Sequence, residues 1–109
     1  MAYDEDLELQ ILSIVDDWPG TAAKKMFGGV CHLLHGNMFC GVWREYVILR
    51  LGEEGAQEAL GKPGTKPFDV TGRPMKGWVM VEKGQLAAAA QLRVWLERAR
   101  GFASTLPPK

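Results

Sequence analysis

Apolar residues recur with a helical period near both ends of the chain. The N-terminal stripe falls at positions i, i+4, i+7, i+8 and i+11, the spacing of a helix that buries one face. Carboxylates crowd its first turn, where they meet the positive end of the helix dipole, and Pro19-Gly20 is expected to end it. The apolar members of this stripe are Leu7, Ile11, Ile14, Val15 and Trp18.

A second helical stripe lies close to the C-terminus. Charged residues such as Arg93 and Glu97 fall off this stripe, as they do in a helix with one buried face. We therefore expect the rings of Trp18, Trp95 and Phe102 in the core. The apolar members of the second stripe are Leu92, Trp95, Leu96, Ala99, Phe102 and Ala103.

After the first helix the apolar period changes to two, and aromatic, β-branched and glycine residues become frequent. This alternation predicts three strands, at about 25–34, 37–43 and 46–51. His35-Gly36 and Arg44-Glu45 fall between these strands and are predicted to form the turns.

A short helix is predicted over about 53–60, ended by the loop GKPGTKP. Phe68–Thr71 and Trp78–Val81 then form a second predicted hairpin. The resulting order is α-β-β-β-α-β-β-α. Because the strands group as hairpins, we expect a two-layer α+β fold, a five-stranded antiparallel sheet covered by helices.

Length and charge narrow the class of protein. We expect one domain over residues 1–109, because a chain of this length buries enough surface for a core without disulfide or metal staples. Thirteen basic and thirteen acidic residues cancel, and no apolar run approaches the ~20 residues of a membrane span. The acidic start is unlike a signal peptide. We therefore expect a cytoplasmic protein without a membrane partner, whose cysteines stay reduced.

Cys31, His32, His35 and Cys40 have the atom types of a tetrahedral zinc site. Their spacing, C-H-x2-H-x4-C, is not that of a closed zinc motif. Neighbouring residues on a strand point to opposite faces, so Cys31 and His32 are not expected to share an ion. We therefore predict no metal.

The same segment raises a redox hypothesis. If His35-Gly36 form the centre of a tight turn, Cys31 lies directly opposite Cys40 with Cα atoms ~4.5 Å apart, a separation that a disulfide tolerates. The alternative, favoured in a reducing cytosol, is two small buried apolar residues. His32 is expected to be a partly exposed sheet residue, and His35 to have a positive φ.

Residues for catalysis are sparse. Ser13 falls within the first helix and Ser104 near the C-terminus, so a serine nucleophile with a base is not expected. A Cys–His site stays formally possible, although strand alternation separates each cysteine from its nearest histidine. The stretch GKPGTK lacks the spacing of a phosphate-binding loop, and no cofactor is predicted.

The charges are unevenly distributed along the chain. The first seventeen residues carry six acids and no base, whereas residues 62–83 carry five bases and two acids. A basic patch there would suit a nucleic-acid backbone, and salt-dependent retention on heparin or DNA would support that function. The alternative is a solvated surface on which the acidic helix neutralises neighbouring bases.

The segment TGRPMKGW is predicted to bind a protein partner. Arg73, Met75, Lys76 and Trp78 surround the rigid Pro74, and arginine, methionine and tryptophan are enriched at protein interfaces. The alternative places Met75 and Trp78 inward, with the charges keeping the hairpin end soluble.

Five segments together resemble the TfoX N-terminal-domain family, which is named after the TfoX/Sxy regulators of natural competence. They are KKMFGG, GNMFCGV, YVILRLG, GRPMKGWVMV and WLERARGFASTLPPK, and they cover essentially the whole chain. The resemblance is to the single-domain bacterial members, so the second, C-terminal domain of the competence regulators is expected to be absent. It implies a two-layer α+β domain with a regulatory or interaction role in the cytoplasm and no known catalytic role.

Three classes of function follow from these observations. The first is a non-catalytic regulatory domain that binds a protein partner. The second is a nucleic-acid-binding accessory protein in transcription or DNA uptake. The third is an enzyme with a Cys/His site.

Overall fold

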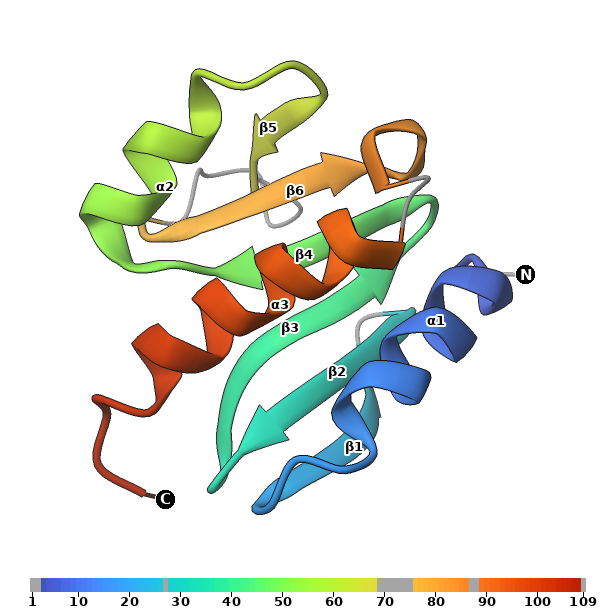
Figure 1. Cartoon of the computed structure of the whole chain (residues 1–109), viewed down its shortest axis with the longest axis vertical. Coiled ribbons are helices and arrows are strands. Elements are labelled where there is room, and N and C mark those ends of the chain that lie inside the picture. Colours follow the sequence, from blue (N-terminus) through green and yellow to red (C-terminus); the bar gives the residue numbers. More distant parts are fainter. Residues whose placement is uncertain (1–2, 27, 69–75, 87–88, 109) are drawn as a thin grey trace.

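The computed structural model describes residues 3–26, 28–68, 76–86 and 89–108. These residues form helices, strands and one short 3-10 helix, labelled in Figure 1. In chain order they are α1 (Glu5–Val15), β1 (Thr21–Met26), β2 (Gly29–Leu34), β3 (Asn37–Trp43), β4 (Tyr46–Arg50), α2 (Gly52–Leu60), β5 (Thr65–Pro67), β6 (Trp78–Glu82), η1 (Lys83–Leu86) and α3 (Ala89–Ala103).

All six strands belong to one antiparallel sheet, in the order β1-β2-β3-β4-β6-β5. The expectation of an α+β fold with an antiparallel sheet is confirmed. The prediction of five strands is wrong, and the predicted element order holds only in part, because a further strand precedes β2.

The additional strand, β1, overlaps only the start of the segment 25–34, which was predicted to be one continuous strand. β1 begins at Thr21 and ends at Met26, and β2 begins at Gly29. Gly28 has a φ of 77°, a conformation that glycine adopts without steric cost. Met26 and Gly29 lie directly opposite each other, so the chain reverses at Gly28 instead of continuing a strand.

The second hairpin also starts earlier than predicted. β5 covers Thr65–Pro67, within the segment predicted to be a loop, and Phe68 follows it as a buried residue outside the strand. Residues 69–71 of the predicted strand lie outside the described residues. β5 is an edge strand, where the missing N–H of Pro67 is tolerated. β6 lies where the sequence predicted it.

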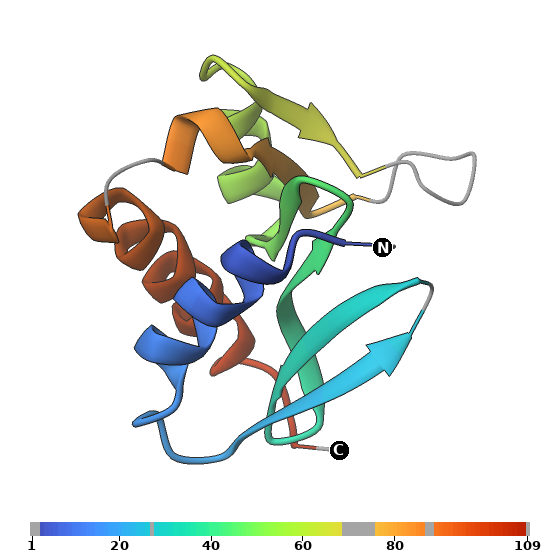
Figure 2. The same ribbon diagram turned by 90° about the vertical axis from the view of Figure 1, so that its right-hand side faces the viewer.

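The three described helices lie on one face of the sheet (Figures 1 and 2). None of them is both long and apolar enough to cross a membrane. The main core lies between these helices and the covered face. Its large, fully buried side chains include Leu7, Ile11, Phe39, Val42, Val47, Leu49, Val79, Leu86, Leu92 and Leu96.

The first helix is shorter than its apolar stripe. The Asp4 carboxylate accepts a hydrogen bond from the N–H of Leu7 at 3.0 Å and caps the helix, which ends at Val15. Trp18 lies beyond the helix and is partly buried, with its ring centroid 6.2 Å from that of Phe39. The prediction that Trp18 is a core residue is therefore only partly correct.

The C-terminal helix buries the predicted stripe, but its rings flank the core. Leu92, Leu96 and Ala99 are fully buried, whereas Trp95 and Phe102 are partly buried. Small and aliphatic side chains allow α3 to lie close to the sheet. The wide rings are displaced to the sides of the helix.

The turn between β2 and β3 forms as predicted. His35 has a φ of 50° and Gly36 a φ of 86°. Next to this turn Leu33 lies opposite Met38, as a two-residue turn requires. The register then shifts, because Phe39 is an extra residue that forms a bulge.

The bulge overturns the predicted cysteine pairing. Cys31 lies opposite Gly41, and Cys40 lies opposite His32. Directly opposite residues share a face and consecutive residues do not, so the two cysteines point to opposite faces of the sheet. The predicted Cys31–Cys40 register is wrong.

Candidate interaction surface

The face of the sheet opposite the helices, here named the helix-free face, carries no helix in the described part of the chain (Figure 2). A row of directly opposed residues crosses all six strands on this face, with an exposed lysine at each end and buried residues between. In sheet order the row is Lys24, Cys31, Gly41, Ile48, Met80 and Lys66. By strand alternation the face also carries Leu33, Met38, Trp43, Tyr46, Arg50, Trp78 and Glu82.

Aromatic rings stand at both ends of the apolar centre of this face. Trp43 and Tyr46 are stacked, with ring centroids 6.4 Å apart and an interplanar angle of 21°. Phe68 and Trp78 lie 5.8 Å apart at 45°. Trp43, Tyr46 and Trp78 remain partly exposed. A ligand on this face therefore meets aromatic surface.

Cations lie over these rings. The Arg44 guanidinium lies 4.5 Å from the Trp43 ring centroid, and that of Arg50 lies 5.3 Å from the Trp78 centroid. The Lys66 ammonium lies 5.3 Å from the Tyr46 centroid and donates a hydrogen bond to the Tyr46 hydroxyl at 3.1 Å. Each such contact contributes about 0.5–1 kcal/mol at an exposed site.

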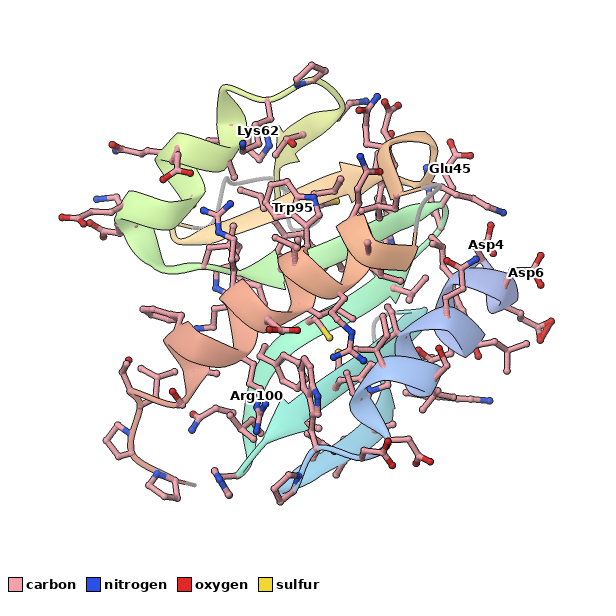
Figure 3. The ribbon with its side chains drawn as sticks, viewed as in Figure 1. Asp4, Asp6, Glu45, Lys62, Trp95 and Arg100 are labelled. Carbon is pink, nitrogen blue, oxygen red and sulfur yellow. The ribbon has the colours of Figure 1, made fainter. Side chains whose placement is uncertain are left out.

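Carboxylates gather elsewhere. Asp4, Asp6 and Glu45 surround Lys83 near the start of α1, as Figure 3 shows for the three acids. Along the strand register, Glu82 is the described carboxylate that shares the helix-free face with the cations. Among the described residues, cations therefore outnumber carboxylates on the helix-free face.

The predicted partner-binding segment adjoins this face. Lys76 is exposed, and Trp78 belongs to the face and contacts Phe68. Lys76 and Trp78 also line a hollow of about 290 Å³ beside α2. Arg73 and Met75 lie outside the described residues.

The cysteine thiols are poor nucleophiles. Both cysteines are fully buried and unpaired. Burial raises the pKa of Cys31 to about 11, with a small opposing effect from Lys24. Burial also raises the pKa of Cys40 well above its usual value, and the charge of Glu8 adds to this. Because the thiolate is the reactive form, burial lowers the nucleophilicity of both thiols at neutral pH.

His32 is buried, contrary to the prediction that it is partly exposed. Its ring lies beneath α1, and its Nε2 atom is 2.7 Å from Oε1 of Glu8. A buried polar side chain needs such a partner, because leaving it without a hydrogen bond costs free energy. The pair joins the first helix to the second strand.

No group of three or more histidine, cysteine, aspartate or glutamate side chains is placed to share a metal ion in the described part of the chain. Cys31 points away from both His32 and Cys40. The four residues of the zinc hypothesis therefore do not converge.

A larger hollow, of about 490 Å³, lies on the helix side between α3 and the segment after α2. Trp95 and Lys62, labelled in Figure 3, both line it. The Arg98 guanidinium lies 5.1 Å from the Trp95 ring centroid and 3.6 Å from the Glu58 carboxylate. This cation is paired with an acid.

Sequence reasoning missed most of the residues on the helix-free face. Trp43, Arg44, Tyr46 and Arg50 come from adjacent strands and their turn, and alternation within one strand predicts the strand but not which residues of its neighbours share a face. The available signal was that rings and cations fall among alternate residues of the neighbouring strands. That signal becomes readable once the register is known.

In the described part of the chain, an antiparallel sheet covered by helices on one face and carrying rings and cations on the other defines a small two-layer α+β domain. The sequence model of the TfoX N-terminal domain matches residues 13–103. The chain belongs to the TfoX N-terminal domain family. Comparisons with curated proteins and with solved structures find no significant match.

Proposed function

We propose that this chain is a non-catalytic regulatory domain of the bacterial cytoplasm that binds an acidic partner through the helix-free face. Membership of the TfoX N-terminal domain family supports a role like that of the competence regulators. The observation that carries the proposal is the placement of cations over partly exposed rings on a sheet face that carries no described helix.

Sheets normally bury one apolar face against helices and expose a polar one. Here the helix-free face has a buried apolar centre around Ile48 and Met80, with rings and cations around it. Aromatic and arginine side chains are the types that dominate binding energy at interfaces. Lys76 and Trp78, which belong to the predicted partner-binding segment, adjoin the same surface.

A binding role also agrees with the state of the reactive groups. The raised pKa values of Cys31 and Cys40 keep both thiols protonated near neutral pH. The Glu8–His32 pair has a structural role, because it satisfies a buried ring beneath α1. Both features support binding over Cys/His catalysis.

The test is affinity purification from a bacterial host, with identification of co-eluting proteins and nucleic acid. The double variant Arg44→Gln/Arg50→Gln should recover about tenfold less partner, because two lost charge contacts of up to about 1 kcal/mol each multiply. The matched control is Lys62→Gln/Arg93→Gln, which removes two exposed charges from the helix side. Equal recovery by the two double variants would place the binding surface elsewhere.

A further inference from the structure

We infer that the acidic partner is single-stranded nucleic acid, with its bases stacked on the rings and its phosphates on the cations of the helix-free face. This inference rests on the proposed function and names the ligand class of the same surface. Stacking rings combined with a cationic track are what sequence-tolerant binders of single strands use.

The spacing of the ring–cation centres suits a nucleotide chain. Trp43 with Arg44 forms one centre, and Trp78 with Arg50 forms the other. Tyr46 and Arg50 lie four residues apart on one face of β4, a separation of about 13 Å. A single strand presents flat bases and anionic phosphates in alternation over such a distance. Bases stack on guanidinium planes as well as on rings, so a cation over a ring extends the platform.

The apolar floor between the centres is another argument. Ile48 and Met80 lie buried between the two centres, with Met38 packed against them. An unstacked base has two apolar surfaces to cover, and the partly exposed side chains that pack over this floor, those of Met38, Trp43, Tyr46 and Trp78, offer apolar contact. Glu82, opposite Tyr46, lies at the other end of β6 from Trp78.

A duplex fits this face poorly. Its bases are already stacked on each other, and reading it requires an element that enters a groove. An acidic peptide would satisfy the cations, but its carboxylates stand on short aliphatic stems and leave the ring faces uncovered. Each cation here is 4.5–5.3 Å from the centroid of a ring on this face, and Arg50 also lies 5.8 Å from that of Phe102 on α3, so the site recognises a ligand in which anion and flat ring are close neighbours.

The binding experiment uses the full chain with labelled oligothymidylate and oligouridylate of about 15 nucleotides, within the site sizes of small stacking domains. A duplex of the same length and polyglutamate are the comparison ligands. Fluorescence anisotropy at increasing salt gives affinities and salt slopes. Both single strands should bind more tightly than the duplex and polyglutamate, and the ratio between them distinguishes DNA from RNA as the source of the ligand.

Two matched variants test the stacking. Trp78→Leu should weaken binding about 5- to 100-fold, the equivalent of one lost stacked base. Trp95→Leu is the control, because Trp95 is also partly buried beside a guanidinium but lies on the helix side. Circular dichroism must show that both variants are folded.

A second pair tests the phosphate contacts and does not depend on removing a ring. Arg50→Gln should lower the slope of log affinity against log salt by about 0.7, the value for one phosphate contact on a single strand. Arg93→Gln, which removes an exposed charge on α3, should leave the slope unchanged.

The inference is overturned if no oligonucleotide binds, if the duplex binds as tightly as the single strands, or if Trp78→Leu and Arg50→Gln bind like wild type. If polyglutamate binds in their place and Arg44→Gln/Arg50→Gln loses its co-purified protein, the proposed function stands and the nucleic-acid inference fails. If that double variant also keeps its partners, both fail.

Discussion

Adjacent residues in this chain have opposite surroundings. Cys31 and His32 follow one another on β2, yet Cys31 lies on the helix-free face and His32 beneath α1. The environment of each follows from strand alternation and from which face the helix covers. Cys31 therefore has a raised pKa through burial. His32 needs a carboxylate partner, which Glu8 provides.

The Glu8–His32 pair predicts a specific stability loss. Glu8→Ala leaves a buried imidazole without its hydrogen bond and should lower the free energy of unfolding by about 1–3 kcal/mol. Glu5→Ala, an exposed position in the first turn of the same helix, is the control and should lose less than about 1 kcal/mol. Urea denaturation at neutral pH measures both. Equal losses would show that the pair does not stabilise the fold.

The cysteines predict a labelling result. Burial and the raised pKa of about 11 at Cys31 should keep both thiols unreactive toward iodoacetamide at pH 7–8 in the native protein. Both should react promptly in denaturant. Mild oxidation of the native chain should give no internal disulfide, because the two side chains lie on opposite faces of the sheet. Rapid native labelling, or a Cys31–Cys40 crosslink seen by mass spectrometry, would contradict this arrangement.

At the scale of the elements, the β2–β3 hairpin owes its final shape to one bulge. The turn at His35-Gly36 sets one register, and the extra residue Phe39 replaces it with another. The bulge buries Phe39 in the main core and brings Gly41 beneath Met38. One residue thereby changes which side chains share a face.

Substitution by alanine should have opposite effects on stability at two glycines. At Gly41 a Cβ atom would lie 2.5 Å from the carbonyl oxygen of Val30, so Gly41→Ala should destabilise the hairpin by about 1–3 kcal/mol. At Gly101, within α3, nothing lies within 4 Å, and Gly101→Ala should stabilise by about 0.5–1 kcal/mol because glycine loses more backbone entropy in a helix. Thermal unfolding of the two variants measures both shifts. A stabilised Gly41→Ala would be incompatible with the observed close approach.

At the scale of the whole molecule, an ion pair joins two segments that are distant in the sequence. The Lys83 ammonium lies 2.7 Å from the Asp4 carboxylate and joins η1 to the start of α1. The hydrogen bond from Lys83 lowers the pKa of Asp4 most, and the hydrogen bond from the N–H of Leu7 has the next largest effect. Together they hold this pKa below its usual value. The ionised carboxylate therefore stabilises the fold above the unfolded-state pKa of ~3.9, and this stabilisation is lost as pH falls through the lower folded-state pKa.

The Asp4–Lys83 ion pair predicts a pH-dependent difference in stability between variants. Asp4→Asn keeps a capping side chain but loses the charge, so its stability deficit relative to wild type should be present near pH 7 and disappear in acid. Asp17→Asn, at an exposed position after α1, is the control and should show little deficit at either pH. Urea denaturation across a pH series gives the comparison. A deficit for Asp4→Asn that persists unchanged in acid would remove the ion pair as its cause.

Local patterns in the sequence determine much of the fold. The periods of 3.6 and 2, the positive φ of His35 and the strands 37–43 and 78–81 follow from side-chain spacing and turn chemistry, which act over a few residues. The family resemblance rests on the same local segments and is confirmed over residues 13–103. The excess of basic over acidic residues in the second half of the chain can also be read from the sequence.

Tertiary structure decided the register, the buried partners and the surface. The position of Phe39 in a bulge depends on how well it packs in the core, which alternation alone does not encode. Glu8 meets His32 across 24 positions of sequence only because α1 crosses β2. Rings and cations from several strands become one face only when those strands pair in this order. Interactions between residues distant in sequence set these features, and the local periods that identify helices and strands are independent of them.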